Sequence, residues 1–218
     1  MELIEAMKQR HSVRQYWDKE IPTEILSQLQ TEIDACNHES GLHIQLVTNE
    51  PKAFDSFMAH YGKFNGVKNY IALVGKKNTN LDELCGYYGE RIVLKAQQLG
   101  LNTCWVALTY KKVPHAFTIK EDEKLLLVIS LGYGKTQGVA RKSKTKEQIS
   151  NANEETPDWF QNGIDAVLLA PTAMNQQKFK FTYQDGKVFA KASVGFYTKV
   201  DLGIAKYHFE LGSGKKIL

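Results

Sequence analysis

Two arginines and a serine near the amino terminus have the types and spacing to bind an anion. They lie in the stretch Arg10-His11-Ser12-Val13-Arg14. If this stretch is extended, strand alternation puts Arg10, Ser12 and Arg14 on one face and His11 and Val13 on the other. Two guanidiniums and a hydroxyl on one face can bind a phosphate or another electron-rich group. The alternative is a short basic surface exposed to water.

A second basic run, Arg141-Lys142-Ser143-Lys144-Thr145-Lys146, lies in a polar stretch over residues 135–156 that we expect to be a long connection. Such a run is more often a solvated linker than a binding site. It could still bind a phosphate if another segment brings the phosphate to it, and Arg10 and Arg14 could do so.

Two further segments could contact a planar ligand. The first is the loop Ala170-Pro171-Thr172-Ala173-Met174-Asn175-Gln176, whose hydroxyl and amide side chains can bond to both donors and acceptors on a heterocycle. The second is residues 100–107, whose backbone amides could point at such a ligand with Trp105 nearby. The alternatives are an ordinary helix–loop–strand connection and a core strand. We favour the core for Cys104, because no nearby histidine could activate its thiol.

Other common chemistries are excluded. Gly134-Lys135-Thr136 follows an apolar run as in a phosphate-binding loop, but that motif requires a glycine where this chain has Ile129. The six histidines form no HExxH motif and no i, i+4 pair, so we expect no metal site. No arrangement of serine, histidine and aspartate suggests a hydrolytic triad.

Composition limits the class of protein. The 218 residues carry a net charge of +4, which suits an anionic ligand but is too weak and dispersed to indicate nucleic acid. The longest apolar stretch, 125–129, is too short to span a membrane, and the acidic amino terminus does not resemble a signal peptide. The three cysteines form no CxxC and suit a reducing compartment, so we expect a cytoplasmic protein.

Hydrophobic periodicity predicts helices and strands mixed without strict β-α-β alternation, so we expect the α+β class. Pro22 and Pro157 mark the starts of two helices, and Gly100 marks the end of a long one. The expected helices are 2–9, one after Pro22, one from Pro51 to Tyr61, 81–99, 157–170 and 201–211. The expected strands are 43–48, 69–75, 125–131, 179–183 and 187–193, with a strand or loop at 103–109.

Part of the chain aligns with itself. Shifted by 135 residues, Pro22 and the helix after it match Pro157 and the helix after that. Shifted by 117 residues, Gly86 faces Gly203. Identity is low, so an internal duplication and two similar but unrelated helix–strand units are both open.

Taken together, these segments resemble the nitroreductase family of FMN-dependent oxidoreductases. The matching pieces are Arg10–Arg14, Gly100–Trp105, the run Val128–Tyr133 with the basic residues Arg141–Lys144, and Ala170–Gln176. They touch most of the chain, and their combination is far more specific than any one of them. The resemblance implies a mixed or antiparallel sheet flanked by helices.

The resemblance also implies roles for these residues. Those that would fall on the FMN tail are Arg10, His11, Ser12, Arg14, Arg141, Lys142 and Lys144. Those that would flank the flavin ring are Trp105, Val106, Ala107 and Leu108, and those that would close over it are Pro171, Thr172, Ala173, Met174 and Asn175. NAD(P)H would be the electron donor, and a nitroaromatic or quinone-type small molecule would take two electrons in a ping-pong reaction. No catalytic side chain is required, and Arg14 would give electrostatic support.

The order of the segments departs from the family. The family's counterpart of loop 170–176 usually lies between the first long helix and the first strand, where this chain has Cys36–Gly41. We therefore expect an intrachain pseudo-dimer. Residues 1–150 would form a near-complete nitroreductase-like unit, and residues 151–218 a trimmed second unit that supplies the partner flavin loop, with both packed as one compact body. This predicts one FMN per chain and a monomer, with a homodimer left open.

Two functions of other classes stay open. The chain could bind FMN without turnover, as a carrier or sensor. It could also be a scaffold whose basic run at 141–146 binds polyanions.

Overall fold

The structure is a computed structural model that describes residues 1–217. The chain divides into two compact units. Unit 1 comprises residues 1–81 and 92–139, and unit 2 comprises residues 82–91 together with residue 140 to the end of the described chain. These units do not coincide with the halves 1–150 and 151–218. The halves are defined by sequence matching and not by compactness, so the duplication stays a prediction.

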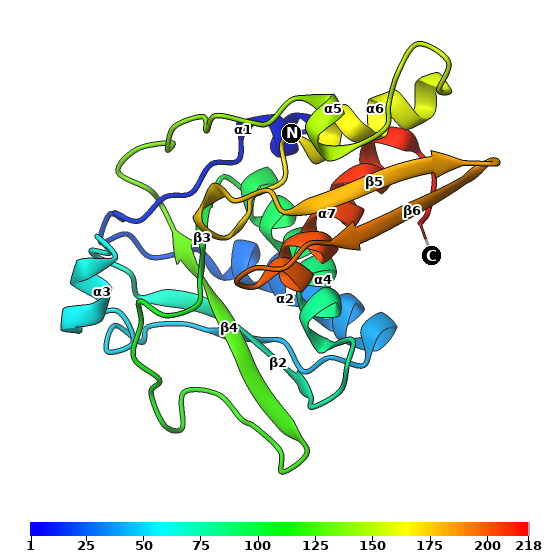
Figure 1. Cartoon of the computed structure of the whole chain (residues 1–218). Helices are drawn as coiled ribbons and strands as arrows, with labels where there is room; N and C mark the ends of the chain where they lie inside the picture. The colour runs from blue at the N-terminus through cyan, green and yellow to red at the C-terminus, as the bar shows by residue number, and fades with distance from the viewer. Residues whose placement is uncertain (218) are drawn as a thin grey trace. The chain divides into compact units, whose positions relative to one another are not determined.

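Unit 1 is built on a four-stranded antiparallel sheet with the order β1-β2-β4-β3. Strands β2 and β4 lie side by side in its centre, paired from Asn69 with Leu131 to Lys76 with Glu123 (Figure 1). The centre of β2 is a continuous run of buried apolar residues, which is typical of an inner strand. The elements are α1 (Leu3–Gln9), α2 (Thr23–Ser40), β1 (Gln45–Val47), α3 (Phe57–Tyr61), β2 (Asn69–Lys76), the second half of α4 (Leu81–Gln98), β3 (Asn102–Val106) and β4 (Glu123–Gly132).

Unit 2 combines helices with a two-stranded hairpin. Three aromatic rings form the centre of its core, and the ring centroid of Phe209 lies 5.7 Å from that of Phe160 and 5.4 Å from that of Phe181. The elements are the first half of α4, α5 (Lys146–Ile149), α6 (Asp158–Val167), the 3-10 helix η1 (Ala173–Asn175), β5 (Phe179–Gln184), β6 (Lys187–Ala192) and α7 (Thr198–Ser213). Strands β5 and β6 pair antiparallel.

The structure confirms the α+β class and most of the predicted elements, with two differences. The helix expected from Pro51 begins only at Phe57. Before it, the Glu50 carboxylate accepts hydrogen bonds from two backbone amides at 2.9 and 3.0 Å and holds a turn, and the side chain of Ser56 then caps α3. The connection at 135–156 contains the short helix α5, which begins with a capping box.

Candidate functional site

The segment from Arg10 to Arg14 is extended because its backbone pairs with two other parts of unit 1. The amide of Val13 donates to the carbonyl of Thr103 at 3.0 Å, and the amide of Asn65 donates to the carbonyl of Arg14 at 3.0 Å. The side chain of Val13 is buried in the core, whereas Arg14 is exposed. Arg14 therefore projects from a backbone that is held on both sides.

Arg14 lines a cavity of about 410 Å³ within unit 1, a volume in the range of small-molecule sites. We call it the unit 1 cavity. The sequence-predicted residues that line it are Arg14, Trp105, Val106 and Ala107. The lining residues that sequence reasoning missed are Tyr61, Gly62, Lys63, Phe64 and Thr109.

The missed residues reach the cavity through a close approach between two loops. A Cβ atom added to Gly62 would lie 2.7 Å from the Cβ of Thr109, so the glycine allows the end of α3 to pack directly on the segment after β3. Lys63 follows with φ of +63°, a left-handed conformation that is uncommon outside glycine and often marks functional sites. In the sequence, the Gly62-Lys63 pair after a helical pattern is the only local signal of this arrangement.

The charges around the unit 1 cavity are positive. Arg14 and Lys63 line it, and its lining residues include no aspartate or glutamate. Within residues 1–217, neither cationic side chain donates a hydrogen bond or joins an ion pair; the Arg14 guanidinium lies 6.0 Å from the ring centroid of Phe64. Together with the rings of Tyr61 and Trp105, these cations suit a planar, electron-rich ligand.

The other predicted residues of unit 1, Arg10, His11, Ser12 and Leu108, are not among the residues that line the cavity. Arg10 is buried at 5% exposure, and Leu108 is 59% exposed. Burial raises the pKa of the Cys104 thiol, and Arg14, Ser12 and Arg10 act in the opposite direction. The side chains of Arg10, Ser12 and Arg14 therefore all lie near Cys104. The protonated, buried thiol fits the core role expected for Cys104.

His11 has its pKa lowered by burial and by the neighbouring Arg10 charge. A Cβ atom added to Gly138 would lie 2.6 Å from the Cβ of His11, so the segment after β4 passes directly over it. The lowered pKa favours the neutral imidazole of His11, which can pack or donate a hydrogen bond but does not add to the positive charge.

The predicted residues of unit 2 form a separate polar cluster, which we call the unit 2 network. Arg141 donates to the carbonyl of Leu168 at 2.7 Å and to the side-chain oxygen of Asn175 at 3.1 Å. The ammonium of Lys144 donates to the carbonyl of Gln177 at 2.8 Å. The Lys142 carbonyl accepts from the side-chain amides of Asn175 and Gln177 at 2.9 and 3.2 Å. The structure thus joins two segments that the sequence analysis singled out separately.

The loop at 171–177 is held in a strained conformation by this network and by α7. Met174, Asn175 and Gln177 have φ of +49°, +54° and +47°, and such strain persists only where the surroundings fix it. From α7, the buried carboxylate of Asp201 accepts the backbone amide of Ala173 at 2.9 Å and the side-chain amide of Gln176 at 2.8 Å. Sequence analysis missed Asp201, because its role depends on a loop that lies 28 residues away in the chain.

Burial raises the pKa of Asp201 to about 6, although hydrogen bonds from Ala173 and Gln176 and the charge of Arg141 act against this. Pro171 is buried, Thr172 and Ala173 are half-buried, and Met174 is 82% exposed. The tip of the loop is therefore presented to solvent on a rigid base.

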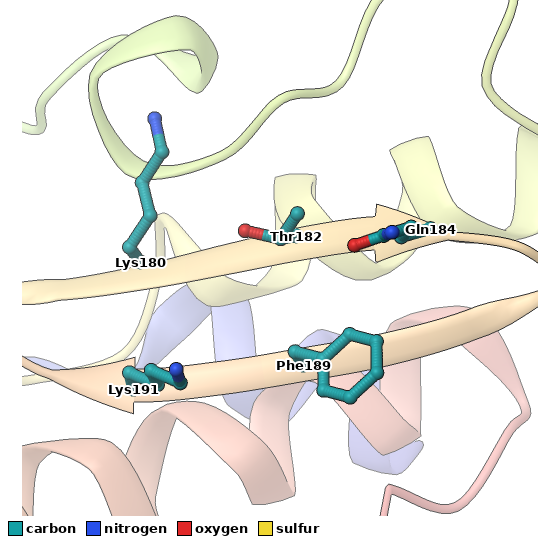
Figure 2. A pocket seen from close by; sticks show the side chains of 5 residues that line it. All are labelled: Lys180, Thr182, Gln184, Phe189 and Lys191. Atoms are coloured by element: carbon teal, nitrogen blue, oxygen red, sulfur yellow. The ribbon is translucent and has the colours of Figure 1, made fainter.

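A second cavity, of about 330 Å³, lies on the outer face of the β5–β6 hairpin (Figure 2). It is lined by Lys180, Thr182, Gln184, Phe189 and Lys191, none of which is a predicted site residue. The ammonium of Lys180 is engaged with the carbonyls of Glu147 and Ser150 at 3.0 and 2.7 Å. The unit 1 cavity is the better candidate, because its cations are available and four predicted residues line it.

Two other features are absent from residues 1–217. No cluster of three or more histidine, cysteine, aspartate or glutamate side chains could hold a metal ion there. In the same range, no helix combines the length and apolar character needed to cross a membrane.

Known proteins resemble this chain over most of its length. Residues 2–213 match the family described as "Putative TM nitroreductase". A relative from Methanothermobacter thermautotrophicus, named "Putative NADH dehydrogenase/NAD(P)H nitroreductase", is 28% identical over 153 residues, which cover 61% of this chain and 78% of the relative.

Solved structures agree with this match. A "putative nitroreductase" of Thermotoga maritima has a TM-score of 0.67 and 26% identity over 97% of this chain and 83% of its own. A "putative nitroreductase in complex with FMN" from Desulfovibrio desulfuricans has a TM-score of 0.56 and 17% identity, covering 72% of this chain and 99% of its own, which shows a shared fold. The resemblance found in the sequence is confirmed, and this chain belongs to the nitroreductase family described as "Putative TM nitroreductase".

Proposed function

We propose that this protein is an FMN-dependent oxidoreductase that uses NAD(P)H to reduce nitroaromatic or quinone-type acceptors by two electrons in a ping-pong reaction. The observation that carries the proposal is the unit 1 cavity, which Arg14, Lys63 and three aromatic side chains line without a carboxylate. The name of the Methanothermobacter relative and the FMN in the Desulfovibrio structure support it.

The groups that line the cavity fit FMN. A flavin presents carbonyl oxygens and ring nitrogens along one edge and an extended aromatic plane, which match cationic donors and aromatic neighbours. When bound, FMN supplies the redox chemistry, taking two electrons from NAD(P)H and returning them to the acceptor. Arg14 and Lys63 would hold its polar edge, and Trp105, Val106 and Ala107 would flank its plane.

The contribution of the chain to the reaction is binding and electrostatics. Reduction places negative charge on the polar edge of a flavin, so Arg14 and Lys63 would favour the reduced cofactor. The backbone of Arg14 is already held by Asn65, which fixes the point from which its side chain extends. Donor and acceptor would bind beside the cofactor in turn, an arrangement that is compatible with a ping-pong sequence.

An absorption spectrum of the purified protein, recorded before and after anaerobic addition of NADPH or NADH, tests the proposal. We expect flavin absorption that bleaches with at least one nicotinamide and returns when menadione is added. Bound flavin that neither nicotinamide bleaches would favour the carrier or sensor alternative. Purified protein that cannot bind FMN at all would reject both.

We also propose that the chain is an internally duplicated pseudo-dimer, as the departure in segment order suggests. Helices α4 and α7 touch reciprocally within unit 2. A Cβ atom added to Gly86 would collide with the carbonyl of Val200, and one added to Gly203 would collide with the carbonyl of Glu83. Each glycine thus contacts the residue three positions before the other. Such mutual contact between equivalent residues is the pattern of a two-fold symmetric interface.

Two further observations support the duplication. Added Cβ atoms on Gly86 and Gly203 would also lie 3.1 Å from the amide nitrogen of Ile204 and 2.8 Å from that of Tyr87, which the same 117-residue shift relates. Helices α2 and α6 begin after prolines with nearly equal dihedral angles, φ −57° and ψ 146° at Pro22 and φ −58° and ψ 145° at Pro157.

The duplication predicts a monomer with a single cofactor, because only the first copy contains an Arg-x-Ser-x-Arg segment. Sedimentation should give the mass of one chain, and heat-released flavin should amount to one FMN per chain. Two FMN per chain would refute the pseudo-dimer without affecting the proposed chemistry.

A further inference from the structure

Helix α3 of unit 1 exposes apolar side chains that a soluble surface does not require. Phe57 is 82% exposed, Tyr61 is 76% exposed and Met58 is 46% exposed, whereas Ala59 on the same short helix is fully buried. Exposed apolar groups that cluster, and are not scattered singly, mark binding surfaces. Helix α3 is cyan in Figure 1.

The exposed residues continue the wall of the unit 1 cavity. Phe57 and Tyr61 are four residues apart, so they are neighbours on one face of the helix. Tyr61 is itself a lining residue of the cavity. The apolar face therefore starts at the rim of the cavity and extends outward by one helical turn to Phe57.

Helix α3 has a defined contact at each end. Its first turn is capped by Ser56, whose hydroxyl accepts the amide of Ala59 at 3.3 Å. At its other end, Gly62 packs on Thr109, as described for the cavity. Leu108, which directly precedes Thr109 in the chain, is a further large apolar residue with an exposed side chain, at 59%.

We propose that α3 recognises the electron acceptor, and that Phe57 and Tyr61 bind its aromatic ring by stacking and edge contacts at the mouth of the cavity. The occupant is a planar aromatic acceptor, because the face is aromatic, continues into the cavity and lies beside the cations Arg14 and Lys63. Such cations favour acceptors with electron-rich substituents, such as nitro groups or quinone oxygens. This inference rests on the proposed function.

The experiment compares two acceptors of different shape in the holoenzyme with NADPH as donor. Menadione is planar and aromatic, whereas ferricyanide is a compact inorganic ion that takes electrons without stacking. Phe57→Ala and Tyr61→Ala should each raise KM for menadione about three- to tenfold, the effect typical of one aromatic contact. Phe57→Ala should leave KM for ferricyanide and for NADPH unchanged, because Phe57 does not line the cavity. Tyr61→Phe, which keeps the ring, should restore the wild-type KM for menadione.

Phe189→Ala is the matched control, because Phe189 is also an exposed phenylalanine at 47% exposure and lies outside the proposed site. It should leave every KM unchanged. An unchanged KM for menadione in both α3 variants would overturn the inference, and so would equal rises for menadione and NADPH in Phe57→Ala. A wild-type dimer that the Phe57→Ala variant dissociates would instead assign this face to a second copy of the chain. Failure of the wild type to reduce ferricyanide would count against the proposed function itself.

Discussion

The cationic side chains of unit 1 and unit 2 have different roles, although both groups look like anion-binding residues in the sequence. In unit 1, the backbone holds Arg14 and Lys63 in place and their charged ends remain at the cavity. In unit 2, the charged ends of Arg141 and Lys144 are engaged by the carbonyls of Leu168 and Gln177. A guanidinium whose donors are already used contributes mainly to folding, whereas one held only by its backbone is available to a ligand. Substitutions of these cations should therefore affect stability in unit 2 and cofactor binding in unit 1.

The largest effect is expected from the titration of Asp201 in unit 2, whose pKa is raised to about 6. The unfolded chain loses this proton near pH 4, so the folded chain holds more protons between about pH 4 and 6. The free energy of unfolding should therefore fall by about 3 kcal/mol as pH rises through this window, since one pKa unit corresponds to about 1.4 kcal/mol.

Asp201→Asn should abolish that fall, because an amide does not titrate. Urea unfolding of the wild type and of Asp201→Asn at several pH values measures this change in the free energy of unfolding. Asp165→Asn is the control, since that carboxylate is exposed and pairs with Lys146 at 2.8 Å. If the wild type and Asp201→Asn showed the same pH profile, Asp201 would not titrate in this window.

The next largest effect is expected from Arg141→Met. This change removes the charge-assisted hydrogen bonds to Leu168 and Asn175 and should lower the free energy of unfolding by about 2 kcal/mol. Lys142→Met should hardly change the free energy of unfolding, because the network uses only the backbone carbonyl of Lys142 and its side chain is exposed. Chemical denaturation compares the two. A stable Arg141→Met protein with much weaker FMN binding would show that Arg141 serves the cofactor, as the resemblance implies, and not the fold.

Arg14→Gln should have the opposite effects to Arg141→Met, with weaker cofactor binding and little change in stability. We expect its free energy of unfolding to change by less than about 0.5 kcal/mol, because the Arg14 backbone bond to Asn65 remains. Its affinity for FMN should fall about tenfold, and reduction by NAD(P)H should slow, because a charge-assisted contact to the cofactor is lost. Fluorescence titration with FMN and stopped-flow reduction measure both. Unchanged affinity and reduction rate would remove Arg14 from the site.

The smallest effect is expected from Lys63→Gln, because the ammonium is exposed and its charge is screened by solvent. We expect FMN affinity to fall about threefold at low salt and the difference to shrink at high salt. Lys63→Arg keeps the charge and should retain wild-type affinity. A loss that did not depend on salt would indicate a contact other than charge.

Some features of this protein follow from local sequence. Helices α2 and α6 begin directly after Pro22 and Pro157, whose fixed φ suits the start of a helix, and the apolar run of β2 is typical of a buried strand. The family resemblance also came from short motifs. It led to four of the residues that line the unit 1 cavity, because Arg14 and the stretch from Trp105 to Ala107 belong to those motifs.

Tertiary structure decided the rest. The helical spacing of Phe57 and Tyr61 is the same whether that face is buried or exposed, and only the packing of Ala59 and Phe64 into the core turned it outward. The role of Lys63 depends on Gly62 meeting Thr109, and that of Asp201 on a loop from another part of the chain. Hydrophobic periodicity indicates which residues share one face of a helix or strand. What that face meets depends on contacts between residues far apart in the sequence, which no local pattern encodes.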